Sequence, residues 1–387
     1  MNRPDAPLSG LTVVERTQSV AGAYAARLLA VLGAETVLVE PPEGHRLREQ
    51  PPLLVSGQSS LFTYLAAGKR SVSIDLRDPV GREQLSELVA GATIYVDDFP
   101  VDERVEAGAS PAALRGGHPE LVYVSVRPFG LSGPKSGWAG EEVTLIHSTG
   151  EGYLLPNGLA YERHPDRPPL KIFGHFAEMQ GGVAAALGAL ASVVSGTGQV
   201  IDVAIQDAVV ALTAFGLQRF GDGSIEHRRT RSFKYGGVHE CADGYVELLT
   251  LEDRQWLGLV TLLGGPAWAA DPALADGVGR GQHGDEINLQ LREWARTKKA
   301  AEIVAAAQQL SVPAAKYATP KDVLNDPHEV ARGLFQLVTV PGIGEFPVLT
   351  APFRLDPTAL RLASGPPELA PPIPAISTFA GGTGGSR

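Results

Sequence analysis

The segment GHFAEMQGG (174–182) places His175 and Glu178 three positions apart, directly before a run of small and apolar residues. Residues 181–194 consist of Ala, Leu, Val, Gly and one Ser, which predicts a close-packed core helix. A carboxylate at the start of such a helix can act as a nucleophile, and a histidine on the same helical face can orient it or donate a proton. The structural alternative is an acid that stabilises the positive end of the helix dipole beside a hydrogen-bonded histidine. The residues alone leave both hypotheses open.

The elements that would position this pair alternate between strand and helix patterns over the first 130 residues. Apolar helical periodicity covers residues 24–33 and 78–92. Short strand-like runs occupy 11–15, 35–42, 71–76, 93–99 and 121–126, and a further one lies within 200–205. This alternation predicts an α/β fold with an open, mainly parallel, Rossmann-like sheet and covering helices. Ligands of such sheets bind beyond the C-terminal strand ends, so EPP (40–42), DDF (97–99) and the loop after SVRPFG are the expected site.

The second half of the chain predicts a smaller α+β domain. A polar, basic stretch at 226–237 is a candidate linker, and DGYVEL (243–248) is followed by helical patterns around 253–264 and 285–309. The Pro- and Gly-rich end, from residue 366 on, is expected to be extended and then disordered.

Composition excludes several classes of protein. The formal charge of −10 argues against nucleic-acid binding, because phosphate contacts need a basic face. Cys241 is the single cysteine, and the nine histidines show no metal-ligand spacing, so no metal site is expected. No apolar run reaches the length of a membrane span, and the first residues lack the apolar core of a signal peptide, which predicts a cytoplasmic protein with no membrane partner.

Seven stretches, taken in order, resemble the class III CoA-transferases, the family named after carnitine CoA-transferase and bile-acid-inducible protein F. Each stretch is weakly informative by itself, but the order makes the resemblance specific. The stretches are LLAVLGAETVLVEPPEGHRLR (28–48), AAGKRSVSIDLRDPVGRE (66–83), YVDDFP (95–100), LVYVSVRPFGLSGP (121–134), TGQVIDVAIQDAVVAL (197–212), DGYVEL (243–248) and VPAAKYATPKDVLNDPHEVARGLF (312–335).

The resemblance implies transfer of coenzyme A between an acyl-CoA and a small carboxylic acid. The family's nucleophile is an Asp at the entry to a small-residue helix, and PPLKIFGHFAEMQGG (168–182) puts Glu178 in its place, with His175 beside it as a second catalytic candidate. A carboxylate of either length can form the mixed anhydride and then the enzyme–CoA thioester. CoA is a substrate in this chemistry, and no tightly bound cofactor is implied.

The register of the family also implies a set of CoA-binding residues. The strand before the Pro-Pro turn usually carries a basic residue where this chain has Leu38, and the family's Asn before Phe is Asp98 here. The predicted CoA-binding residues are Val20, Ala21, Arg46, Lys69, Arg70, Asp98, Arg104 and Lys135.

The family's assembly implies the domain organisation. Its members form interlocked-ring dimers in which long segments link a large and a small domain. We therefore predict a homodimer with a large α/β CoA-binding domain at 1–221, a small α+β domain at 222–310, and a segment at 311–387 that returns to the large domain.

Two alternatives to CoA transfer follow from the same family. One is racemisation of a 2-methylacyl-CoA by α-proton exchange, in which Glu141 stands where a relative would have histidine. The other is a non-catalytic CoA-binding subunit of a heteromeric enzyme, which the changes at Leu38, Asp98 and Glu178 favour. The acyl and acceptor acids are not encoded in any pattern of the sequence.

Overall fold

We describe the chain from a computed structural model, which describes residues 6–155, 164–212 and 235–372. The described residues form two compact units, and each is treated by itself. The larger unit comprises the described residues of Met1–Leu155, Pro168–Ile225 and His328–Arg387. The smaller unit comprises the described residues of Pro156–Arg167 and Glu226–Pro327.

The larger unit is built on a six-stranded sheet in the order β3-β2-β1-β4-β5-β6, with every neighbouring pair parallel. This confirms the predicted open parallel α/β sheet. The order reverses direction between β1 and β4, the place where sheets of this kind leave a crevice for ligands. The strands are β1 (Thr12–Arg16), β2 (Glu35–Glu40), β3 (Arg70–Ser73), β4 (Ile94–Asp97), β5 (Val122–Arg127) and β6 (Val200–Ala204).

Local sequence sets the helix boundaries of this unit. Ser19, Ser59, Asp78 and Ser110 cap helix N-termini with their side chains, and Gly196 ends α9 in the left-handed conformation that glycine adopts without strain. The helices are α1 (Val20–Val31), η1 (Arg46–Glu49), α2 (Ser60–Ala66), α3 (Pro79–Ala90), α4 (Val101–Glu106), α5 (Pro111–Gly117), α6 (Glu142–Ser148), α7 (Glu151–Leu154), α9 (Phe176–Ser195) and α10 (Ile205–Leu212).

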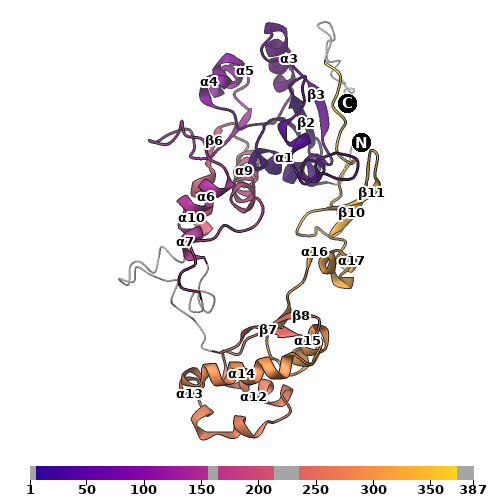
Figure 1. Cartoon of the computed structure of the whole chain (residues 1–387). Coiled ribbons are helices and arrows are strands. Elements are labelled where there is room, and N and C mark those ends of the chain that lie inside the picture. The colour runs from indigo at the N-terminus through magenta and orange to yellow at the C-terminus, as the bar shows by residue number, and fades with distance from the viewer. Residues whose placement is uncertain (1–5, 156–163, 213–234, 373–387) are drawn as a thin grey trace. The chain divides into compact units, whose positions relative to one another are not determined.

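Helices α1 and α9 pack side by side in the centre of this unit (Figure 1) and share one apolar core with β5. Glycine allows the close approach: a Cβ on Gly182 would lie 2.7 Å from the carbonyl oxygen of Ala21, and one on Gly181 would lie 2.7 Å from Ile205. Helix α9, at 20 residues, is long and apolar enough to cross a membrane by length and composition alone, so the expectation that no such run exists was wrong. Its buried face lies in the protein core, including Ala185 and Ala189.

The C-terminal part of the chain completes the larger unit. The hairpin β10 (Phe335–Val340) and β11 (Gly344–Leu349) follows α17 (Pro327–Arg332). The buried guanidinium of Arg27 on α1 donates a hydrogen bond to the carbonyl of Leu349. Pro372 then forms a parallel bridge to Ser73, so the chain's last described residues lie along the outer edge of β3.

The smaller unit has an antiparallel sheet of β7 (Gly237–Cys241), β8 (Gly244–Leu248) and β9 (Ala314–Lys316). Because β9 pairs with β8, the chain remains in this unit beyond residue 310, and the segment that rejoins the larger unit begins at His328 rather than at 311. The predicted 221/222 boundary and most of the predicted linker at 226–237 lie outside the described residues. The helices are α12 (Asp253–Leu262), η3 (Ala267–Ala270), η4 (Pro272–Leu274), α13 (Gly277–Gln282), α14 (Gly284–Ala295), α15 (Ala300–Gln309) and α16 (Pro320–Leu324).

The contact between α1 and α9 predicts the effect of a single methyl group. Gly182→Ala places Cβ against a backbone oxygen that cannot move aside, so we expect a loss of about 1–3 kcal/mol in the free energy of unfolding. Gly116→Ala is the control: Gly116 lies in α5, where an added Cβ would meet nothing within 4 Å, and this variant should gain about 0.4–1 kcal/mol. Urea unfolding of both variants checks this, and equal effects would contradict it.

Candidate active site

Glu178 lies in the first turn of α9 and is only 6% exposed to solvent. Helix α9 begins at Phe176, so His175 is the N-cap residue and its ring makes no cap bond to the backbone. Instead, Nδ1 of His175 lies 2.7 Å from Oε2 of Glu178. This hydrogen bond raises the pKa of His175 above its ordinary value, although partial burial acts in the opposite direction. The structure therefore brings the two predicted catalytic residues into direct contact.

Glu142 fixes the start of the same helix. Its two carboxylate oxygens accept hydrogen bonds from the backbone N–H groups of Ala177 and Glu178, each at 3.1 Å. This satisfies two of the N–H groups that a helix leaves unpaired at its N-terminus. Glu142 is buried, and this contact with the start of α9 accounts for its burial. Glu141, the residue that racemisation would need, is exposed and makes no side-chain cap bond at the start of α6.

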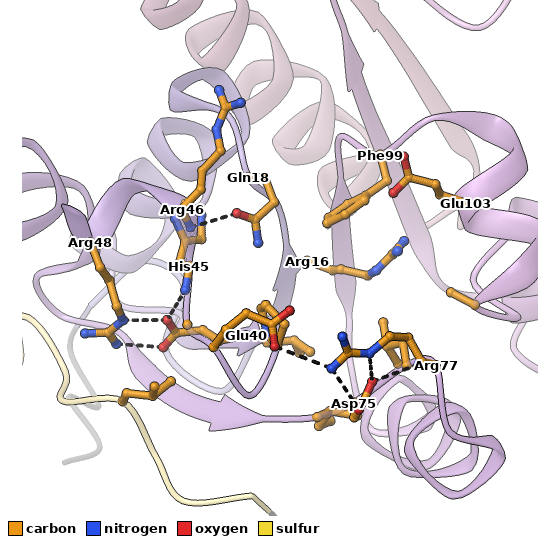
Figure 2. A pocket seen from close by; sticks show the side chains of 18 of the residues that line it. Arg16, Gln18, Glu40, His45, Arg46, Arg48, Asp75, Arg77, Phe99 and Glu103 are labelled. Carbon is orange, nitrogen blue, oxygen red and sulfur yellow. Dashed lines mark hydrogen bonds and ion pairs between the residues drawn. The ribbon is translucent and has the colours of Figure 1, made fainter. Parts of the chain in front are cut away.

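A cavity of about 1190 Å³ lies at the C-terminal ends of β1 to β4, on the side where the loops that follow these strands meet. Figure 2 shows its wall, with Arg16 from the end of β1, Glu40 from the end of β2 and Phe99 from the loop after β4. The loop after β3 contributes Asp75 and Arg77. The size and position fit the ligand crevice that the sheet topology predicts.

Most of the charged side chains that line the cavity form ion pairs. Glu40 accepts two hydrogen bonds from Arg48, at 2.6 and 2.7 Å, and one from the backbone N–H of His45 (Figure 2). Arg16 pairs with Asp97 at 2.8 Å, and Arg77 pairs with Asp75 at 2.7 Å. The paired groups give the cavity a rigid polar wall.

His45 is neutral in this setting. Burial, followed by the positive charge of Lys69, lowers the pKa of His45 to about 3. Its Nδ1 therefore serves as an acceptor, and takes a hydrogen bond from the backbone N–H of Leu47 at 3.1 Å.

Asp98 connects the loops that surround the cavity. Its carboxylate accepts hydrogen bonds from the backbone N–H groups of Gln18 and Ser19, at 2.9 and 2.6 Å, directly before α1. Gln18 in turn accepts a hydrogen bond from the backbone N–H of Arg46 at 2.9 Å through Oε1 (Figure 2). Burial raises the pKa of Asp98 above its ordinary value, while the bonds from Ser19 act against that change. The loops after β4, β1 and β2 are thus joined in one chain of hydrogen bonds.

The predicted CoA-binding residues are found in several places. Arg46 lines the cavity and is exposed, with no ion pair to any described carboxylate. Val20 and Ala21 are buried in the first turn of α1, at the end of the helix that faces Asp98. Lys135 lies in the loop after β5, with its ammonium 5.4 Å from the centre of the Phe129 ring. Their contacts with CoA stay predictions.

The other three cations predicted to bind CoA form ion pairs with carboxylates of this chain. Lys69 is 4% exposed, pairs with Glu15 at 2.6 Å and has a pKa lowered by burial. Arg104 is 1% exposed and pairs with Asp97 at 2.7 Å. Arg70 is the first residue of β3, so it lies at the N-terminal end of the parallel strands, whereas the cavity lies at their C-terminal ends; it pairs with Glu35 at 3.6 Å. None of the three lines the cavity.

Glu40 and Pro41 of EPP and Phe99 of DDF line the cavity as predicted, but the prediction missed Arg16, Gln18 and Arg77. The signal was present for two of them, because Arg16 directly follows LTVVE and Arg77 directly follows SVSIDL. In the parallel sheet, residues in these positions must lie at the ligand edge. No group of three metal-ligating side chains is present among the described residues.

The chain is similar to known proteins in both sequence and structure. The model of the family described as CoA-transferase family III matches residues 8–370. Succinyl-CoA–D-citramalate CoA-transferase of Chloroflexus aurantiacus is 30% identical over 92% of this chain and 89% of its own. Subunit BbsE of succinyl-CoA:(R)-benzylsuccinate CoA-transferase of Thauera aromatica is 28% identical over 85% of this chain and 83% of its own. The crystal structure of a CAIB/BAIF family protein from Brucella suis superposes with a TM-score of 0.84 at 29% identity, covering 95% of this chain and 97% of that one.

The cap on α9 predicts a stability difference between two adjacent glutamates. Glu142→Gln leaves one amide NH₂ facing a backbone N–H, so one hydrogen bond is lost inside the protein, and we expect a loss of about 1–3 kcal/mol in the free energy of unfolding. Glu141→Gln makes the same chemical change at an exposed position and should stay within about 0.5 kcal/mol of the unchanged protein. Urea denaturation measures both. A loss of the same size in the two variants would show that Glu142 does not fix the helix.

Proposed function

This chain belongs to CoA-transferase family III, and we propose that it transfers coenzyme A from an acyl-CoA to a carboxylic acid through Glu178. The observation that supports this is the buried carboxylate of Glu178 at the N-terminus of α9, hydrogen-bonded to His175. This carboxylate lies at the positive end of the helix dipole, which interacts favourably with an anion. Succinyl-CoA occurs in the names of both relatives above and is the first donor to test.

The proposed chemistry exchanges bonds at two carbonyl carbons. A carboxylate oxygen of Glu178 attacks the thioester carbon, and the C–S bond breaks to release the CoA thiolate and leave a mixed anhydride. The thiolate then attacks the glutamyl carbon, which releases the first acid and forms a glutamyl–CoA thioester. The acceptor carboxylate attacks this thioester, and the same two steps run in reverse. No oxidant, reductant or metal is consumed.

His175 gives Glu178 a fixed geometry in this scheme. Glu178 is one methylene longer than the family's Asp, which moves the carboxylate by up to ~1.5 Å. Misplacement by about 1 Å can reduce a rate a hundredfold. The hydrogen bond from His175 to Oε2 restrains the longer side chain and leaves Oε1 for attack. A neutral His175 that donates from Nδ1 suits this role, because a full positive charge would weaken the nucleophile.

We further propose that the nucleotide part of CoA occupies the cavity at the ends of β1 to β4. Phosphates often bind at the N-terminus of the first helix in such folds. Here the carboxylate of Asp98 already accepts the N–H groups before α1. The phosphates must therefore be held elsewhere, and Arg46 and Arg77 offer guanidinium groups at the cavity wall.

A non-catalytic subunit is the second candidate. Glu178 and Asp98 stand where the family has Asp and Asn, and one relative is named as a subunit of its enzyme. In that case the chain would bind CoA and pair with a paralogous subunit that carries the Asp. In the catalytic case we propose a homodimer, as in the family.

The series at Glu178 tests the leading proposal. Incubation with succinyl-CoA should add the mass of a CoA thioester to the unchanged protein, and hydroxylamine or borohydride should trap the adduct at Glu178. Glu178→Gln should bind CoA but form no adduct, because the anionic oxygen is gone. Glu178→Asp should form the adduct at a rate at least about tenfold lower, since the pocket and His175 suit the longer side chain.

Intact mass spectrometry and peptide mapping decide the outcome. An adduct on Glu178→Gln, or one mapped to another residue, would exclude Glu178 as the nucleophile. If neither the unchanged protein nor either variant forms an adduct with any of a panel of acyl-CoAs, the non-catalytic subunit is the better explanation.

The cavity predicts which arginine binds CoA. Arg46→Gln should raise the dissociation constant of CoA about threefold to tenfold and flatten its dependence on salt, because one cationic contact is lost. Arg70→Gln makes the same charge change at the N-terminal end of β3, away from the cavity, and should leave the affinity for CoA unchanged. Isothermal titration calorimetry at two salt concentrations measures both. Weaker binding by Arg70→Gln alone would show that the cavity is not the CoA site.

A further inference from the structure

Lys171 lies in the segment that leads into α9 and the proposed nucleophile, and it has no acidic partner among the described residues. The ammonium of Lys171 donates hydrogen bonds to the carbonyl oxygens of Ile172 and Gly174, each at 2.8 Å. Gly174 has a positive φ of 85°, and its peptide leads directly into His175, the N-cap of α9. The ammonium is therefore held in place one residue before the His175–Glu178 pair.

The charge of this ammonium is uncompensated within the described part of the chain. A lysine ammonium has three N–H donors, of which Lys171 uses two on neutral carbonyls. No described carboxylate forms an ion pair with it, and its residue is exposed. Lys69 and Arg104, by contrast, are buried against Glu15 and Asp97. Lys171 is thus an ordered cation with one donor directed to solvent or to a ligand.

The surroundings of Glu178 explain why a cation is useful there. Glu178 and Glu142 place two carboxylates at the start of α9. A substrate acid brings a further negative charge when it leaves or attacks, and an acid with two carboxylates brings one more, so such a substrate would be repelled without a nearby cation. The pKa of His175 is raised overall, first by the hydrogen bond to Glu178, and the positive charge of Lys171 acts against that shift.

We propose, resting on the proposed function, that Lys171 binds the second carboxylate of a dicarboxylic acyl group, so that the site selects dicarboxylic over monocarboxylic acids of the same length. The acyl carbonyl lies at Glu178, and the distal carboxylate accepts the third N–H of Lys171. The contact is charge-assisted, and its loss removes affinity for the dicarboxylic acyl group alone. A monocarboxylic acyl group has no atom that can use it.

Succinyl-CoA and butyryl-CoA make a matched pair, because both have four acyl carbons and only the first has a distal carboxylate. The unchanged protein should form the Glu178 adduct from succinyl-CoA with a kcat/KM at least about tenfold higher than from butyryl-CoA. Lys171→Gln keeps hydrogen-bond donors for the two carbonyls and removes the charge, so it should lower the value for succinyl-CoA about tenfold and leave that for butyryl-CoA nearly unchanged. Lys171→Arg should retain the preference. Lys321→Gln, at an exposed position in the smaller unit, is the control and should change neither value.

The ratio of the kcat/KM values for succinyl-CoA and butyryl-CoA separates the outcomes. An equal loss for both thioesters in Lys171→Gln would indicate disturbed folding of the 172–174 turn or a contact with CoA itself, and would overturn the proposal. An unchanged preference in that variant would also overturn it. If no adduct forms from any thioester, the proposed function fails but the inference is still decided by calorimetry: succinyl-CoA must bind more tightly than butyryl-CoA, by a margin that shrinks with added salt. Should Lys171→Gln not fold, that salt dependence in the unchanged protein decides the question.

Discussion

The carboxylate of Glu142 on the first N–H groups of α9 is the interaction on which the candidate active site depends. It joins α6 to α9 across 35 residues of sequence and defines where α9 begins. That start places Glu178 in the first turn and His175 at the N-cap, where the imidazole can reach the carboxylate. The close approach of Gly182 to α1 then fixes the helix from its other side. On our proposal, the longer side chain of Glu178 must be restrained to act where the family has aspartate, and the hydrogen bond to His175 provides that restraint.

Among the loops that surround the cavity, Asp98 has a comparable structural role. In many nucleotide-binding sheets the N-terminus of the first helix is open to a phosphate. In this chain a carboxylate from the loop after β4 is bound there, and the same contact positions Gln18 and, through it, the backbone of Arg46. Asp98, which stands where the family resemblance implies Asn, adds a negative charge to this loop. On our proposal, the cationic contacts to CoA therefore come from arginines that line the cavity, such as Arg46 and Arg77.

The sequence predicted the sheet well because each strand is a short apolar run between turn residues, and such runs are buried on both faces of a parallel sheet. Family register located Glu178 and His175, and their contact agrees with the helical spacing. The cations were predicted less well. Lys69, Arg104 and Arg46 all appear in the sequence as basic residues near strand ends, but their partners Glu15 and Asp97 decide whether they are buried, and those pairings arise only from the three-dimensional packing. Glu142 was missed for the same reason, since its partners are backbone groups that carry no sequence signal.

The order in which the larger unit is completed has a consequence for synthesis of the chain. Strand β5 is made more than seventy residues before its partner β6, and the outer edge of β3 waits for Pro372 until nearly the whole chain has emerged. Until then Arg27 also lacks the carbonyl of Leu349. Unpaired strand edges and unsatisfied buried cations favour wrong associations. The nascent polypeptide thus spends most of its translation with an incomplete sheet, and we expect its yield to depend on chaperones and on the rate of elongation more than its native stability would suggest.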